Sequence, residues 1–140
     1  MRILGRREHS ARQLERKLEI RGHDEARARE VVGRLAESGW QSDSRFAETL
    51  ARSRAGQGYG PLRIRAELQA AGVSDTDMRA ALDALDVDFV ESARRQHARH
   101  FGGPPASAAE RQKQYRYLAG RGFDAEQVRA VLKGDPEAFS

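Results

Sequence analysis

The chain has 140 residues, no cysteine and a formal net charge of +4 at pH 7. The lack of cysteine excludes disulfides, thiolate nucleophiles and zinc sites with Cys ligands. No apolar run approaches the roughly 18 residues needed to cross a bilayer, and the first seven residues lack the apolar core of a signal peptide. We therefore expect a small cytoplasmic protein without a membrane partner, held together by packing alone.

An internal period of 50 residues organises the chain. Residues 18–22, 68–72 and 118–122 lie in register, each beginning with Leu and ending with Gly, and the apolar positions that follow them also align. Apolar residues at every third or fourth position mark a helix face that must be buried. Repeats of this size are typical of stacked helical units. The period thus predicts an all-α tandem array of three units with about eight helices.

In chain order, the first unit is predicted over residues 1–58, with helices at about 3–20, 25–38 and 43–55. Ser10 and Gln13 have the spacing of a capping box at the start of the first helix. Gly22 is expected to end that helix, and Asp24 to cap the second. The predicted core of this unit consists of Leu14, Leu18, Ala28, Val31, Val32, Leu35, Trp40, Phe46 and Leu50.

The second unit is predicted over residues 59–103, with helices at about 62–71, 75–85 and 88–101. Its first helix follows a glycine-rich linker and Pro61, which fits the first position of a helix. The sequence Gly102-Gly103-Pro104-Pro105 is the strongest breaker in the chain. The third unit is predicted over 104–140 and is incomplete, with only two helices, at about 108–119 and 125–133. A hinge at this breaker leaves the oligomeric state open, because a terminal unit can be exchanged between chains.

Residues with catalytic or ligating chemistry are sparse. His97 and His100 share a helix face, but no third group converges on them by sequence, so we expect no metal and no cofactor. The glycines of residues 56–60 do not follow a strand and lack the Lys-Ser/Thr of a phosphate loop, so a linker between helices is the better interpretation. No nucleophile motif is present. The sequence indicates a protein that is not an enzyme.

Arginines form the most distinctive polar groups. The surplus of basic residues lies in residues 1–58, with 13 basic against 9 acidic side chains. Guanidinium groups near an aromatic ring suit phosphates or an acidic protein surface. They also suit helix dipoles, local ion pairs or plain solvation, and both interpretations stay open. The candidate partner-binding residues are Arg52, Arg54, Tyr59, Arg63 and Arg65, with a second stripe of Arg94, Arg95 and Arg99.

A helix-turn-helix reader of DNA sequence is disfavoured. The candidate second helices, 25–38 and 75–85, both begin with acidic residues, which would repel phosphates at the end that enters the major groove. An independent nucleic-acid-binding or transcription-regulating helical protein nevertheless remains the alternative to a protein that binds another protein.

Three ordered segments of the chain form a distinctive set of motifs. They are Arg7-Glu8-His9-Ser10-Ala11-Arg12-Gln13-Leu14, Gly39-Trp40-Gln41-Ser42-Asp43-Ser44-Arg45-Phe46-Ala47 and Gly58-Tyr59-Gly60-Pro61-Leu62-Arg63-Ile64-Arg65-Ala66-Glu67-Leu68. These segments resemble the RecX family, the regulators of RecA recombinase. The resemblance extends through residues 70–73 and weakly to 121–124.

The resemblance implies three tandem three-helix units in a bacterial cytoplasmic protein. It also implies binding to the RecA filament on DNA and modulation, usually inhibition, of RecA ATPase, strand exchange and co-protease activity in DNA repair and recombination. Single- or double-stranded DNA is a further candidate partner. Gln13 departs from the Glu usual in the family, but keeps the capping role. The family's signature positions are mostly architectural, so it supplies no catalytic residues to this chain.

Overall fold

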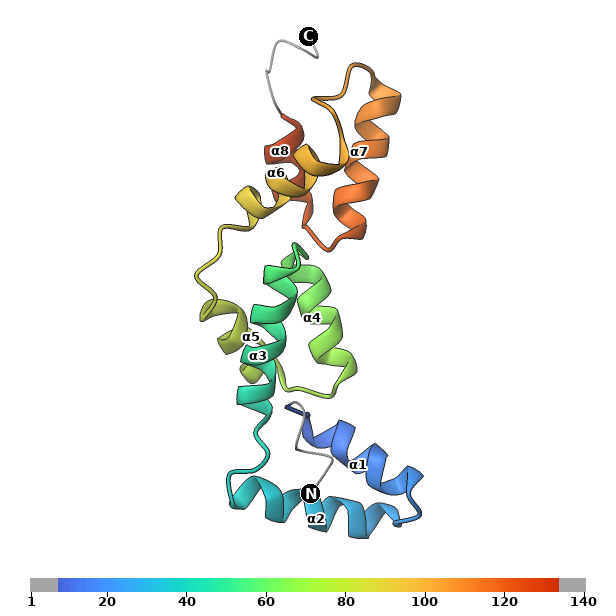
Figure 1. Ribbon diagram of the computed structural model, residues 1–140, viewed down its shortest axis with the longest axis vertical. Helices are drawn as coiled ribbons and strands as arrows, with labels where there is room; N and C mark the ends of the chain where they lie inside the picture. The colour runs from blue at the N-terminus through green and yellow to red at the C-terminus, as the bar shows by residue number, and fades with distance from the viewer. Residues whose placement is uncertain (1–7, 134–140) are drawn as a thin grey trace. The chain divides into compact units, whose positions relative to one another are not determined.

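The computed structural model describes residues 8–133, and every regular element within that range is an α-helix. This confirms the predicted all-α array of about eight helices. The first helix was expected from Ile3; it begins at Ala11, because Ser10 caps it, and residues 3–7 lie outside the described range. The helices (Figure 1) are α1 (Ala11–Ile20), α2 (Glu25–Glu37), α3 (Asp43–Gly56), α4 (Pro61–Ala70), α5 (Asp75–Asp83), α6 (Phe89–His100), α7 (Ala108–Gly120) and α8 (Ala125–Leu132).

The predicted helix ends are confirmed at the three repeated turns. The glycines at positions 22, 72 and 122 have φ values of 101°, 80° and 99°, a left-handed conformation that side chains with a Cβ rarely adopt. In each turn the residue after the glycine donates its N–H to the carbonyl of the repeated leucine five residues earlier, at 3.1–3.3 Å. This is the Schellman arrangement. Asp24, Ser74 and Asp124 then cap the following helices.

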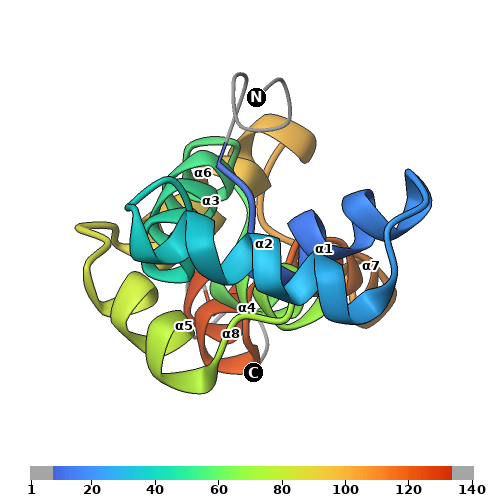
Figure 2. The same cartoon turned by 90° about the horizontal axis from the view of Figure 1, so that it is seen from below.

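The chain divides into two compact bodies, which are described separately. The first comprises residues up to 52 together with 66–85, and in it α1 packs along α2 (Figure 2). Of its predicted core, Leu14, Ala28, Val32 and Phe46 are buried. Four others are only half-buried: Leu18, Val31, Leu35 and Leu50.

The prediction that Trp40 belongs to the core is wrong, because 64% of its surface is exposed. α2 ends at Glu37, and Gly39, with φ 84°, turns the chain before Trp40 is reached. The Trp40 N–H still bonds to the carbonyl of Leu35 at 2.9 Å. The backbone is thus fixed by the helix end, but the helical spacing that predicted burial no longer applies beyond it.

The second body comprises residues 53–65 and the chain from 86 onward. Here α6, α7 and α8 pack together as a three-helix bundle (Figure 1). Its core consists of Ala93, Leu118, Phe123, Val128 and Leu132. α6 therefore packs with the two helices predicted for the third unit, and the predicted limits of the units stay a prediction. α6 had been assigned to the second unit by chain order, but its Ala93 is buried with side chains of α7 and α8.

A contact between a helix start and a glycine turn occurs twice at the 50-residue period. In the first body, the Ser10 hydroxyl at the start of α1 donates to the Ala71 carbonyl at 2.7 Å. In the second, the Gly60 N–H at the start of α4 donates to the Arg121 carbonyl at 2.9 Å. Residues 10 and 60 are 50 apart, as are 71 and 121. The period therefore repeats a packing contact as well as a helix pair.

Candidate partner-binding surface

The linker between α3 and α4 is held in place by Arg121, at the turn between α7 and α8. Its guanidinium donates from one Nη to the Gln57 carbonyl at 2.9 Å and from Nε to the Gly58 carbonyl at 3.3 Å. Two further backbone bonds join the same regions, from Gly60 to Arg121 and from Leu62 to Gly122, both at 2.9 Å. These hydrogen bonds therefore hold the linker in a fixed position against the turn between α7 and α8, within the second body.

Two cations contact the ring of Tyr59. The guanidinium carbons of Arg63 and Arg121 lie 4.6 Å and 4.4 Å from the centre of its ring. These are cation–π distances, and the ring is half-buried. Tyr59 was a candidate for contact with a partner. The structure gives its ring a packing role and brings only Arg63 of the candidate arginines onto it, while contact with a partner stays a prediction.

The other candidates of this group have different surroundings. Arg52 on α3 and Arg65 on α4 are exposed. Arg54 is half-buried and reaches the side-chain oxygen of Gln57 at 3.4 Å. Arg52 and Arg65 therefore remain the members of the group whose side chains stand in solvent without a structural contact described for them.

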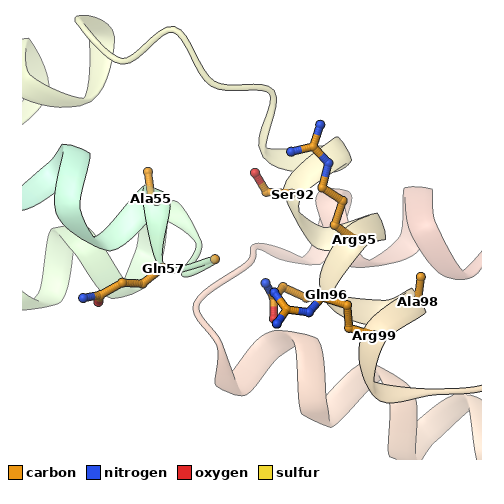
Figure 3. A pocket seen from close by; sticks show the side chains of 9 residues that line it. Ala55, Gln57, Ser92, Arg95, Gln96, Ala98 and Arg99 are labelled. Carbon is orange, nitrogen blue, oxygen red and sulfur yellow. The ribbon is translucent and has the colours of Figure 1, made fainter.

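The second stripe, on α6, divides as well. Arg94 and Arg95 both approach Glu91, at 3.0 Å and 3.6 Å, so one carboxylate serves two guanidinium groups. Arg95 and Arg99 also line a cavity of about 390 Å³ beside the linker. Figure 3 shows the α6 side of this cavity, with Gln96 and Arg99 extending toward the loop that carries Gln57. Arg94 does not line it.

The histidines of α6 have packing roles. His97 Nε2 lies 2.7 Å from the side-chain oxygen of the buried Gln114, and the His100 ring stacks on Tyr117 with centroids 3.8 Å apart. Tyr115 and Tyr117 lie on α7, which packs against α6. Both are half-buried and pack against the core of the α6–α8 bundle. Within residues 8–133 no three His, Cys, Asp or Glu side chains converge as metal ligands do.

Sequence reasoning did not single out Arg121 or Gln96. Arg121 precedes Gly122 as Arg21 precedes Gly22, so its position in the repeat does not distinguish it. Its role depends on the linker that packs against it from more than 60 residues away. Gln96 is one of many polar residues on α6, and no local signal in the sequence distinguishes it as a cavity residue.

The fold and surface define a class of protein: a tandem array of three-helix bundles that carries exposed arginines and, over the described residues, no helix able to span a membrane. Family models agree with this class along the chain. They match RecX, first three-helix domain, at residues 1–35, RecX, second three-helix domain, at 42–82, and RecX, third three-helix domain, at 86–132. The limits of these segments differ from those of the predicted units 1–58, 59–103 and 104–140, which stay a prediction.

Curated relatives carry the same name. "Regulatory protein RecX" of Stenotrophomonas maltophilia (strain R551-3) is 44% identical over 136 residues, which cover 96% of this chain and 83% of the relative. The protein of that name from Xanthomonas axonopodis pv. citri (strain 306) is 45% identical, with 96% and 84% covered. The chain belongs to the RecX family.

Solved structures agree on the fold. The crystal structure of RecX from Lactobacillus salivarius superposes with a TM-score of 0.78 at 20% identity, covering 94% of this chain and 88% of the other. A second structure, of regulatory protein RecX, gives a TM-score of 0.77 at 20% identity, with 95% of this chain and 67% of the other covered.

Proposed function

We propose that this protein is a non-enzymatic, cytoplasmic regulator of DNA repair and homologous recombination. It binds the filament that RecA forms on DNA and inhibits RecA ATPase, strand exchange and co-protease activity. The observation that carries the proposal is the family match along nearly the whole chain, to relatives named regulatory protein RecX. The described surface supports it through arginines that have no packing role.

The structure sharpens the choice of residues for a test. Arg63 stacks on Tyr59 and Arg54 contacts Gln57, so replacing either would disturb the linker as well as the surface. Arg52 and Arg65 are exposed. The variant of choice is therefore Arg52→Gln/Arg65→Gln, with Arg79→Gln/Arg129→Gln as a control that removes the same charge from two other exposed positions, on α5 and α8.

The experiment measures RecA ATPase on single-stranded DNA while each variant is titrated in. We expect the wild type and the control to inhibit alike, and the test variant to need a several-fold higher concentration, because exposed charge pairs contribute about 0.2–1 kcal/mol each. Failure of the wild type to inhibit or bind the filament would refute the proposed function. Undiminished inhibition by the test variant would exclude only these two arginines.

The alternative function, an independent nucleic-acid-binding or transcription-regulating protein, is supported by the exposed arginines alone. It requires binding to naked DNA with a steep dependence on salt, since each neutralised phosphate releases counterions. Pull-down on DNA with and without RecA at physiological salt separates the two functions. We expect retention to depend on RecA.

A further inference from the structure

The cavity beside α6 has two walls of different chemistry. One wall is the linker at the end of α3, and the other is a stripe of polar side chains on α6. The stripe follows the i, i+3, i+4, i+7 spacing of a single helix face. Its members are Ser92, Arg95, Gln96 and Arg99, and no aromatic ring or carboxylate joins them in the lining that the described residues provide.

The linker wall is fixed before any ligand arrives. Arg121 binds the carbonyls of Gln57 and Gly58, as described above. Gly58 also lies so close to α6 that a Cβ at this position would be 2.0 Å from Nε2 of Gln96. Gly58 and Gln96, one on each wall, thus approach each other closely. A ligand therefore meets a preformed pocket, which reduces the ordering cost of binding.

The charges along α6 leave the cavity positive. Among the arginines that line the cavity, Arg95 forms an ion pair with Glu91, and Glu91 is shared with Arg94. The Arg95–Glu91 pair is 3.6 Å long with 74% of the Arg95 side chain exposed, so solvent weakens it. Arg99 is exposed and has no ion pair among the described residues. At least one guanidinium is thus available to an anion.

The arrangement favours a short acidic side chain over a nucleic-acid strand. Arg95 and Arg99 are one helical turn apart, with Cβ atoms about 5–6 Å from each other, so both can reach one carboxylate. A strand running along α6 would meet Asp88 and Glu91 at the other end of the helix, where phosphates are repelled. The cavity also offers no ring for base stacking, on which single-strand binding relies.

We propose that the cavity formed by residues 55–58 and the Ser92–Arg99 face of α6 receives an Asp or Glu side chain of the protein partner, held by Arg95 and Arg99. The inference rests on the proposed function, because the acidic group is supplied by the RecA filament. Ser92 and Gln96 supply neutral hydrogen bonds beside the two cations. Arg94, on the same helix, has no part in the site.

The test compares Arg95→Gln/Arg99→Gln with Arg94→Gln. The probe is a RecA filament on a single-stranded oligonucleotide with a slowly hydrolysed ATP analogue, and a second arm uses the oligonucleotide alone. We expect the double variant to bind the filament about tenfold more weakly or worse, since it loses the charge-assisted hydrogen bonds to the acidic side chain. We expect Arg94→Gln to stay within about threefold of the wild type, since its pair is exposed.

Each other outcome has a definite meaning. If the double variant keeps its fold by circular dichroism and binds the filament as the wild type does, the acidic-side-chain site is refuted while the proposed function stands. If Arg94→Gln weakens binding as much as the double variant, the effect is one of general charge and the site is also refuted. Equal losses on filament and naked oligonucleotide would assign the pocket to phosphate. Absence of wild-type binding to the filament removes the proposed function and the inference together.

Discussion

The glycines of the repeated turns share a backbone conformation but not their surroundings. Gly22 and Gly122 have φ values of 101° and 99°. A Cβ at Gly22 would find no atom within 4 Å, whereas one at Gly122 would lie 2.4 Å from the Cβ and 2.7 Å from the backbone nitrogen of Arg63. The first turn therefore requires glycine for its dihedral angles alone. The last turn requires it also because the start of α4 packs against it.

This difference predicts unequal effects of the same substitution. Gly22→Ala should lower the free energy of unfolding by about 1–2 kcal/mol, the usual cost of a left-handed non-glycine residue. Gly122→Ala adds a clash with backbone that cannot move aside cheaply, and should cost at least about 2 kcal/mol more. Urea unfolding of the two variants measures the difference. Equal losses would mean that the contact with α4 does not constrain this turn.

At the scale of elements, the linker between α3 and α4 depends on one side chain from a distant turn. Arg121 supplies two hydrogen bonds to linker carbonyls and a cation–π contact to the Tyr59 ring. A lysine keeps the charge but has neither the fork of donors nor the planar group for stacking. The linker should consequently be sensitive to a substitution that is conservative in charge.

We therefore predict that Arg121→Lys lowers the free energy of unfolding by about 1–2 kcal/mol, roughly the worth of the bonds that lysine cannot replace. Arg129→Lys, at an exposed position on α8, should change it by less than about 0.5 kcal/mol. Thermal unfolding followed by circular dichroism compares the two. A neutral Arg121→Lys would show that the backbone bonds of Gly60 and Leu62 hold the linker unaided.

The helices and their ends could be predicted because their signals are local. Ser10 with Gln13 forms the capping box that their spacing indicates, and the repeated glycines end helices as expected. Such signals depend on residues within a few positions of each other. The helix ends that these signals predict therefore do not depend on how the rest of the chain packs.

Features that depend on distant packing could not be predicted in the same way. The exposure of Trp40, the packing of α6 with α7 and α8, and the role of Arg121 are decided by which elements meet in space. The candidate arginines were found from sequence as basic groups near helix ends. Whether a candidate arginine packs against the chain, as Arg63 does, or lines the cavity, as Arg99 does, depends on which residues are its neighbours in space.

At the scale of the whole molecule, the contacts that repeat every 50 residues suggest how stability is distributed. In arrays of this kind each unit is stabilised by its neighbour, so a local change acts mainly on the adjoining unit. The Gly60 and Leu62 N–H groups donate to the turn that contains Arg121 and Gly122. In the first body the Val73 N–H donates to Leu68 at 3.1 Å, and that body contains neither the linker nor Arg121.

Native-state hydrogen exchange of Arg121→Lys should therefore separate the two bodies. With the linker loosened by about 1.4 kcal/mol, the amides of Gly60 and Leu62 should exchange about tenfold faster, because exchange follows the free energy of local opening. The Val73 amide should exchange at the wild-type rate, since its bond to Leu68 lies in a body that the substitution leaves intact. Equal acceleration at all three amides would contradict this and show that the chain opens as one cooperative body, with the repeated contacts transmitting the loss from one unit to the next.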